Sequence, residues 1–238
     1  MSGVVVLFSG GQDSTTCLYL AIRDVGAENV LALTVDYGQR HAVELQSAKA
    51  IARLAKVKHI VTSQIDLSGV NDRNALTAKG VIKPSGGLAD NEAPGGLPTT
   101  FVPLRNPLLL TIAAMAAANV GAEFVYTGVC QQDYSGYPDC RDSFVDAFNA
   151  MLAAALPSSV KTYVVAPLMF TTKADTVKLA RSLPGCWDAL ALSHTCYRGL
   201  RPACMQCPAC ELRQKGFEEA GEVDPANQVV LPRVADYD

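Results

Sequence analysis

The chain has 238 residues, of which 49% are hydrophobic and 18% are charged, and its formal net charge is −3. This composition is typical of a globular protein with one sizeable core, or of one domain with a small appendage, and the acidic balance argues against tight binding to a nucleic acid. The N-terminal segment lacks the basic region of a signal peptide, and the longest apolar stretch, from Leu108, is too short to span a bilayer. We therefore expect a cytoplasmic protein with no membrane partner and no stable nucleic-acid partner.

Strand-like and helix-like segments alternate at the start of the chain. We predict strands over residues 4–8, 30–36 and 59–63, and helices over residues 13–24 and 42–54. The first strand is a continuous apolar and β-branched run, which indicates burial on both faces of a sheet. The βαβαβ order predicts an α/β fold with a doubly wound, mainly parallel sheet and right-handed crossovers.

The α/β pattern is interrupted and then resumes. Residues 67–100 are rich in Gly, Pro, Asn and Asp, which indicates a mobile lid, an assembly arm or plain disorder. The remaining elements that we predict are helices near 106–120, near 142–155 and after 172, and strands over 123–127 and 163–166, which complete a five-stranded sheet. We predict an α/β domain over residues 1–185 and a helical, cysteine-rich module over residues 186–238.

A glycine-rich turn, SGGQDS, joins the first predicted strand to the first predicted helix. Its backbone N–H groups and the partial positive charge of the helix N-terminus form a nest for a phosphate or pyrophosphate, which Gly10 and Gly11 allow to approach closely. Ser9 and Ser14 can donate hydrogen bonds, and Asp13 can cap the helix or hold Mg²⁺ through its hydration shell. The alternative is a tight turn capped by a serine. The lysine-containing phosphate loop and the dinucleotide-binding glycine pattern are both absent from the sequence.

The C-terminal part contains the spacing C-x7-C-x2-C-x2-C, formed by Cys196, Cys204, Cys207 and Cys210. Four thiolates complete a closed tetrahedron around Zn²⁺, so we predict a structural zinc site with no open position for substrate. Iron–sulfur ligation and redox thiols are the alternatives. The other cysteines, Cys17, Cys130, Cys140 and Cys186, are most simply buried small hydrophobic residues or loop residues.

Polar and aromatic residues gather after the predicted strand over 123–127, where doubly wound sheets place ligand loops. Tyrosine can stack on a planar ring while Asp and Arg read its edge, although a solvated loop is the alternative. The candidate residues in this loop are Asp133, Tyr134, Ser135, Tyr137, Asp139 and Arg141.

Further polar candidates stand at other element boundaries. Arg105 and Asn106 begin a predicted helix, where an anion or a ribose can bind. Lys173 begins a late helix and can reach a phosphate as a point charge, but a lysine on a solvated face would look the same. The segment after the second predicted strand carries Asp36, Tyr37, Gln39, Arg40 and His41, the last of which could equally be a surface residue.

The stretch SGGQDSTTCL resembles the pyrophosphate loop of the N-type ATP pyrophosphatases, which have the adenine nucleotide α-hydrolase-like fold. Members of this superfamily split ATP between its α and β phosphates and adenylate a substrate oxygen. The resemblance implies that the loop holds the phosphates of ATP with Mg²⁺, and that adenine lies near the end of the second strand. The residues that it implicates in ATP binding are Phe8, Ser9, Gly10, Gly11, Gln12, Asp13, Ser14, Thr15, Thr16, Cys17, Leu18, Val35 and Asp36.

A longer series of motifs resembles the QueC family of queuosine precursor biosynthesis. These motifs are SGGQDSTTCL, VDYGQRH, TFVPLRN, GVCQQDYSGYPDCRDSF, TTKADT and the four-cysteine tail, in one order over nearly the whole chain. The resemblance implies a homodimer that converts 7-carboxy-7-deazaguanine, ATP and ammonia to the nitrile preQ0. It also implies two adenylations, first of the acid and then of the amide.

The same resemblance assigns roles to the candidates. It implies that the catalytic residues are Asp13, Ser14, Arg105, Asp133 and Lys173. It implies that the deazaguanine lies against Tyr37, Gln39, Arg40, Arg105, Asn106 and the candidates between 133 and 141. The chain departs from the family pattern at Leu104, where glycine is usual, and at Gln131 and Gln132, which replace Glu-Thr; residues 67–100 and the tail after Gly221 also match poorly.

Two other classes of function remain open at this point. A tRNA-modifying enzyme of the same superfamily would adenylate a base, but the acidic balance argues against it. A zinc-stapled nucleotide-binding or scaffold protein would have no turnover, and the dense polar loops argue against that. Residue 2 is a serine and not a cysteine nucleophile, and we see no segment for a glutaminase domain, so we expect nitrogen to arrive as ammonia or from another protein.

Overall fold

The structure is a computed structural model, which describes residues 3–37, 42–62, 65, 101–131 and 137–227. Some positions discussed above lie outside these ranges. They are Gln39, Arg40, His41, Gln132, Asp133, Tyr134, Ser135 and the segment 67–100.

The fold is built on a five-stranded sheet in which every strand pairing is parallel, with the order β3-β2-β1-β4-β5. Its strands are β1 (Gly3–Leu7), β2 (Val30–Val35), β3 (Lys58–Thr62), β4 (Ala122–Tyr126) and β5 (Tyr163–Val165). The chain winds outward from β1 to β3 and then returns to β4 on the other side of β1. The loops after β1 and β4 therefore flank the point where strand order reverses, which is where doubly wound sheets bind ligands.

The sheet separates two hydrophobic cores. Val4 and Val6 face one core and Val5 faces the other, and none of the three is more than 1% exposed. Burial on both faces explains why β1 is a continuous apolar run. The first core packs against α1 (Gln12–Val25) and α2 (Ala42–Leu54), and the second against α3 (Arg105–Val120) and α4 (Asp142–Ala155).

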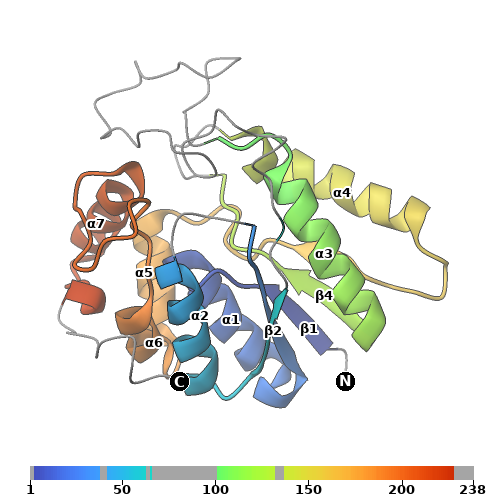
Figure 1. Ribbon diagram of the computed structural model, residues 1–238, viewed down its shortest axis with the longest axis horizontal. Helices are drawn as coiled ribbons and strands as arrows, with labels where there is room; N and C mark the ends of the chain where they lie inside the picture. Colours follow the sequence, from blue (N-terminus) through green and yellow to red (C-terminus); the bar gives the residue numbers. More distant parts are fainter. Residues whose placement is uncertain (1–2, 38–41, 63–64, 66–100, 132–136, 228–238) are drawn as a thin grey trace.

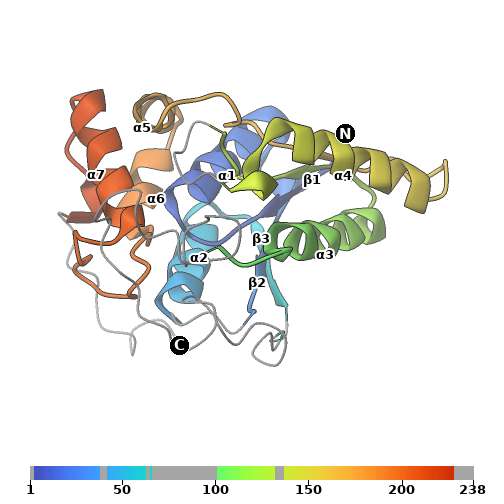
Figure 2. The same ribbon diagram turned by 90° about the horizontal axis from the view of Figure 1, so that it is seen from above.

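The C-terminal helices gather at the end of the molecule opposite α3 and α4 (Figures 1 and 2). They are α5 (Lys173–Ser182), α6 (Cys186–Leu192) and α7 (Pro208–Ala220), and short 3-10 turns lie at Ala27–Asn29, Pro138–Cys140 and Pro225–Asn227. Leu190 of α6 and Phe217 of α7 belong to the same core as Val6. These two helices therefore pack on the same side of the sheet as α1 and α2. The structure confirms the predicted α/β class with a doubly wound parallel sheet and a helical C-terminal part.

A buried arginine ties the C-terminal segments together. The Arg213 guanidinium on α7 forms a bidentate ion pair with Asp224, at 2.6 and 2.8 Å, and donates hydrogen bonds of 2.8 Å to the hydroxyls of Ser193 and Thr195. Because a buried charge is stable only when it is paired, this network fixes the segment after α6. No helix within the described ranges is long and apolar enough to cross a membrane.

Candidate functional site

The phosphate loop, residues 9–14, leaves β1 through a turn that only glycine fits. Gly10 has a φ of +80°, and a Cβ at this position would lie 2.6 Å from the backbone nitrogen of Ala48 and 3.0 Å from the carbonyl oxygen of Glu44. The loop therefore packs directly on the first turns of α2. Both the positive φ and the close approach require glycine.

The serines of the loop hold its own backbone. The Ser14 hydroxyl donates to the Gly11 carbonyl at 3.2 Å and accepts from the Ser9 N–H at 3.3 Å, while the Ser9 hydroxyl accepts from the Gly11 N–H. The N-cap of α1 is Gly11, without a side-chain cap, so neither a serine nor Asp13 caps the helix, and the alternative of a serine-capped turn is wrong. The first N–H groups of α1 thus have no capping side chain, which suits an anion.

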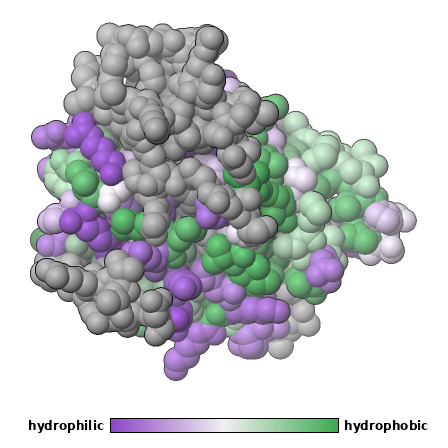
Figure 3. All heavy atoms as spheres, in the orientation of Figure 1, coloured by the Kyte–Doolittle hydropathy of each residue, from purple (hydrophilic) through white to green (hydrophobic). Residues whose placement is uncertain are grey.

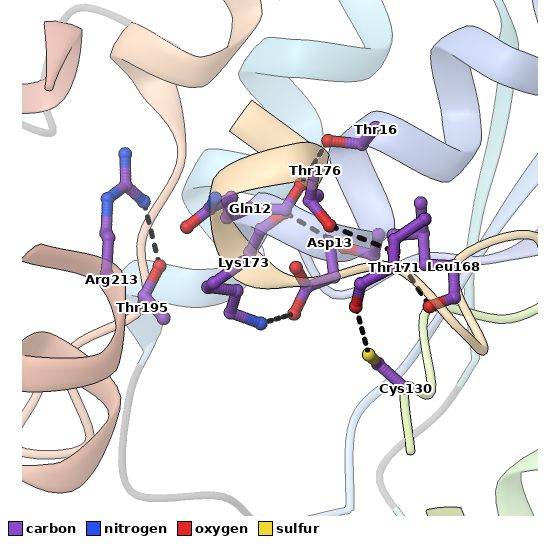
Figure 4. A network of polar contacts seen from close by, with 12 residues as sticks. Gln12, Asp13, Thr16, Cys130, Leu168, Thr171, Lys173, Thr176, Thr195 and Arg213 are labelled. Carbon is purple, nitrogen blue, oxygen red and sulfur yellow. Dashed lines mark hydrogen bonds and ion pairs between the residues drawn. The ribbon is translucent and has the colours of Figure 1, made fainter. Parts of the chain in front are cut away.

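Lys173 and Asp13 meet beside the phosphate loop (Figure 4). The Lys173 ammonium, at the first residue of α5, donates to one Asp13 carboxylate oxygen at 2.7 Å, and both side chains are largely buried. The other Asp13 oxygen is buried and has no hydrogen-bond partner in the described part of the chain; the same holds for both amide atoms of Gln12, which is 2% exposed. Unsatisfied buried polar atoms are costly, by about 1–3 kcal/mol each, so these groups fit a site that binds a polar ligand.

Two glycines allow other elements to approach this pair. A Cβ on Gly128, in the loop after β4, would lie 3.1 Å from the Ser14 nitrogen, and one on Gly216 of α7 would lie 2.9 Å from Cβ and Cγ of Lys173. The His194 N–H also donates to the Gly10 carbonyl at 3.0 Å. The phosphate loop and its lysine are therefore supported by the C-terminal segments, a connection that the sequence did not indicate.

The remaining residues that the family resemblance implicates in ATP binding lie around the loop. Phe8, Cys17 and Leu18 are buried in the core, and Thr16 donates to the Gln12 carbonyl at 3.0 Å. The Thr15 hydroxyl is buried and unsatisfied within the described residues. Val35 ends β2 in the core, and Asp36 follows it with partial exposure.

A second group of residues surrounds Arg105, the first residue of α3. We call it the Arg105 cluster, and its members are Tyr37, Glu44, Arg105, Tyr137, Asp139 and Tyr197. The Tyr37 phenol oxygen accepts a hydrogen bond from the guanidinium. Burial alone would lower the pKa of Arg105, but Tyr37, the other two tyrosines and Asp139 raise it, so the guanidinium stays charged.

Predicted substrate residues divide into two groups in the structure. It brings Tyr37, Arg105, Tyr137 and Asp139 together in the cluster, and the Tyr137 ring lies 5.5 Å from that of Phe101. The other two described candidates, Asn106 and Arg141, are not members of the cluster. Buried Asn106 donates to the Asp139 carbonyl at 3.0 Å and joins α3 to the turn at Pro138–Cys140, whereas Arg141 is exposed at the N-cap of α4.

Two members of the cluster, Glu44 and Tyr197, were not among the residues predicted from the sequence. Burial raises the pKa of Glu44 from 4.5 to about 7, against the opposing effect of the Arg105 charge. Burial also raises the pKa of the Tyr197 phenol, with Tyr137 adding to the shift. The only signals near them in the sequence are the DYGQRH motif, which ends shortly before Glu44, and Cys196, which precedes Tyr197.

The four cysteines of the tail come together as predicted. The Sγ atoms of Cys196, Cys204, Cys207 and Cys210 all lie within 4.8 Å of one another, and those of Cys207 and Cys210 are 3.4 Å apart. Cys204 is partly exposed and the other three are buried. Four mutually close thiols fit one tetrahedral metal ion without an open ligand position.

The parallel sheet, with a glycine-built loop between β1 and α1, defines an α/β protein with a PP-loop-like fold. The family model described as queuosine biosynthesis protein QueC matches residues 3–221. The chain therefore belongs to the QueC family. A relative from Chromobacterium violaceum named 7-cyano-7-deazaguanine synthase is 51% identical over 93% of this chain and 91% of its own length. A relative of the same name from Laribacter hongkongensis is 47% identical over 93% and 92%.

Solved structures are more distantly similar, and a tRNA thiolase is one of them. The U34-tRNA thiolase NcsA from Methanococcus maripaludis with its 4Fe-4S cluster has 12% sequence identity and a TM-score of 0.44, covering 97% of this chain and 76% of that chain.

Proposed function

We propose that the chain catalyses the ATP-dependent conversion of 7-carboxy-7-deazaguanine and ammonia to 7-cyano-7-deazaguanine. The observation that carries this proposal is the contact of the phosphate loop with α2 at Glu44, which sets the loop beside the Arg105 cluster. An anion-binding loop next to a tyrosine-rich cluster that holds the buried Arg105 guanidinium suits AMP transfer from ATP to the carboxylate of a planar acid. The name that the two relatives share supports the identity of that acid and of the product.

In the proposed adenylation, backbone N–H groups of the phosphate loop and the Lys173 ammonium stabilise the charge of the departing pyrophosphate. Lys173 is held in place by its 2.7 Å ion pair with Asp13. The unsatisfied Asp13 oxygen fits a group that holds hydrated Mg²⁺. Mg²⁺, when bound, neutralises phosphate charge as the bond between the α and β phosphates breaks.

The chemistry requires two activations of the same carbon. A carboxylate is a poor electrophile, and adenylation gives it a good leaving group, so that ammonia displaces AMP and forms the amide. A second ATP adenylates the amide oxygen, and loss of AMP with the amide protons forms the nitrile. Arg105 orients the acid for the first step and the amide for the second. Our proposed contacts with the base are completed by Gln39, Arg40, Asp133, Tyr134 and Ser135, which lie outside the described residues.

We propose that the cysteine cluster holds a structural Zn²⁺ in a module of residues 186–238, joined to the α/β domain of residues 1–185. All four thiols lie close enough to bind one ion, and the closed arrangement offers no position for substrate. We expect Cys207→Ser to lose the metal and much of the folded structure, as measured by elemental analysis and circular dichroism. Iron with visible absorption in the wild-type protein would contradict zinc.

We propose that the protein is cytoplasmic, as expected from its sequence, and that it is a homodimer, as the family resemblance implies. Apolar side chains gather over α3 and α4 in the space-filling view (Figure 3). The exposed large apolar side chains of these two helices are Met115 and Val120 of α3, which are 67% and 50% exposed, and Met151 of α4. Light scattering after size exclusion tests the dimer, and a monomer at micromolar concentration would contradict it.

The experiment that tests the function combines the protein with 7-carboxy-7-deazaguanine, ATP, Mg²⁺ and ammonium and analyses the products by mass spectrometry. We expect the nitrile, with two AMP and two pyrophosphate released per nitrile. ADP with orthophosphate, or turnover that needs tRNA and ignores the free acid, would contradict the proposal.

A pair of serine variants tests the role of the phosphate loop. Ser14→Ala removes the hydroxyl that holds the turn and should lower turnover strongly. The matched control is Ser182→Ala at the exposed end of α5, which should leave turnover unchanged, because its hydroxyl bonds only within its own helix.

A further inference from the structure

Glu44 carries a carboxylate that the mechanism above does not use. It lies in the first turn of α2, and its backbone oxygen is 3.0 Å from the position of a Cβ on Gly10, so it borders the phosphate loop. The side chain is only partly exposed. In residues 3–37, 42–62, 65, 101–131 and 137–227, no hydrogen bond or ion pair of this carboxylate is present.

The surroundings of this carboxylate are those of the Arg105 cluster. The Arg105 charge acts on Glu44, and the Glu44 charge acts in turn on Tyr37 and Tyr197. Glu44 and Arg105 thus interact electrostatically but form no ion pair with each other, while the guanidinium hydrogen-bonds to Tyr37. The Glu44 carboxylate therefore has no ion-pair partner among the described residues, and it shares its surroundings with a guanidinium and with tyrosines.

The chemistry of the two charges defines the ligand that fits them. A guanidinium matches a carboxylate or carbonyl oxygen, and a carboxylate matches two parallel N–H donors. The aminopyrimidinone ring of a deazaguanine presents such donors, the ring N–H and the exocyclic amino group, along one edge. Its carbonyl and 7-carboxylate oxygens lie elsewhere on the same plane, and tyrosine faces suit the flat ring.

We propose that Glu44 determines base specificity by accepting hydrogen bonds from the ring N–H and the exocyclic amino group of the deazaguanine substrate. This inference rests on the proposed function and assigns the donor edge of its substrate to one residue. Burial raises the pKa of Glu44 to about 7, which agrees with a carboxylate withdrawn from bulk water before the ligand arrives. Substrate donors then replace the lost hydration.

This role predicts discrimination against a base without the amino group. A site built to bond a polar group rejects an analogue that lacks it, because the partner is left unpaired. We expect the wild-type protein to prefer 7-carboxy-7-deazaguanine over 7-carboxy-7-deazahypoxanthine, which lacks the amino group, by about 100-fold in kcat/KM. The loss should appear mainly in KM for the acid.

The test measures AMP release for both acids with the wild-type protein and with Glu44→Gln, which keeps the shape of the side chain. Glu44→Gln should lose about 100-fold in kcat/KM for the deazaguanine acid and only a few-fold for the analogue, so that the preference collapses while KM for ATP stays unchanged. Glu44→Asp should restore part of the preference. The control is Glu28→Gln, an exposed acid at the opposite end of β2, which should change neither value.

The outcomes separate this inference from the proposed function. If Glu44→Gln lowers kcat/KM equally for both acids, Glu44 only balances the Arg105 charge and the inference is wrong, while the function stands. Turnover of the two acids at equal rates by the wild-type protein overturns the inference in the same way. If the wild-type protein converts neither acid, the proposed function falls and this assignment falls with it.

Discussion

The phosphate loop and the Arg105 cluster touch at Glu44 but are built in different ways. The loop is one continuous stretch, residues 9–14, whose proposed binding groups are backbone N–H groups, and Gly10 and serine hydroxyls fix its geometry. The cluster is made of side chains that come from separate parts of the chain, between Tyr37 and Tyr197. The difference teaches that the loop is sensitive to steric changes, whereas the cluster is sensitive to changes of charge.

The largest expected effect is steric and falls on the phosphate loop. In Gly10→Ala the new Cβ would lie 2.6 Å from the Ala48 nitrogen, at a φ of +80°, so the loop or α2 must move. A misplacement of about 1 Å in a catalytic site can cost about 100-fold, and we expect at least that loss in AMP formation.

The matched control for this variant is Gly121→Ala. Gly121 also has a positive φ, +69°, but no atom lies within 4 Å of its added Cβ. It should cost about 1–2 kcal/mol of stability from backbone strain and leave activity intact. Equal losses of activity in the two variants would show that strain, and not the contact with α2, sets the effect.

The second effect is one of charge and falls on the cluster. The folded-state pKa of Glu44, about 7, is above its ordinary value of 4.5. Wild-type stability should therefore fall as pH rises from about 4.5 to about 7, because the folded state disfavours the charged carboxylate. Glu44→Gln removes this dependence, and we expect it to stabilise the substrate-free protein by about 1–3 kcal/mol at pH 8 and by little at pH 5.

Urea unfolding of both proteins at the two pH values checks this expectation. The Arg105 charge partly offsets the cost of burying the ionised Glu44 carboxylate. The Glu44→Gln variant also loses this favourable interaction. A gain of the same size at pH 5 and pH 8 would mean that packing, and not ionisation, explains the variant.

The same contrast between local and distant contacts explains which parts of the fold and of the site could be predicted from the sequence. The strand β1 was predictable because burial on both faces produces the run of valines from Val4 to Val6, and the loop was predictable because its glycines and serines are adjacent. The four cysteines were predictable from spacing, since their ligand atoms are close in sequence as well as in space.

Residues whose partners lie far away in the chain escaped prediction. Glu44 looks like an ordinary acid in the first turn of an amphipathic helix, and its environment arises only when α3 brings Arg105 beside it. Arg213 looks like a surface residue of α7 until Asp224 and the segment after α6 close over it. A serine that caps α1 was also a possible interpretation of the sequence, but the serine hydroxyls form hydrogen bonds within the turn and do not cap the helix.

A third prediction concerns the junction between the phosphate site and α7. In Gly216→Ala the added Cβ would lie 2.9 Å from Cβ and Cγ of Lys173, so the lysine stem must shift away from its position beside Asp13. We expect about a tenfold fall in kcat, with KM for the acid unchanged. Stability should hold, because alanine favours a helix interior over glycine by about 1 kcal/mol.

A double variant separates displacement of the lysine from a general effect on α7. Gly216→Ala should cause no further loss of kcat in a Lys173→Ala background, since the ammonium whose position it would change is already absent. Gln214→Ala, at an exposed position of the same helix, should leave kcat unchanged. Additive losses would contradict a role through Lys173.

The smallest expected effect is a gain in stability on substitution of Leu104, the residue directly before Arg105. Leu104 is the N-cap of α3 in the left-handed region, with φ 60° and ψ 15°, and its side chain is 74% exposed. A residue other than glycine pays about 1–2 kcal/mol there, whereas glycine adds roughly 0.5–1 kcal/mol of backbone entropy loss on folding. Leu104→Gly should therefore raise the free energy of unfolding by up to about 1 kcal/mol, measured in urea, and leave AMP formation unchanged because Arg105 keeps its backbone position. A loss of stability would mean that the leucine side chain is held by contacts worth more than the strain, and that this departure from the family pattern is compensated within the protein.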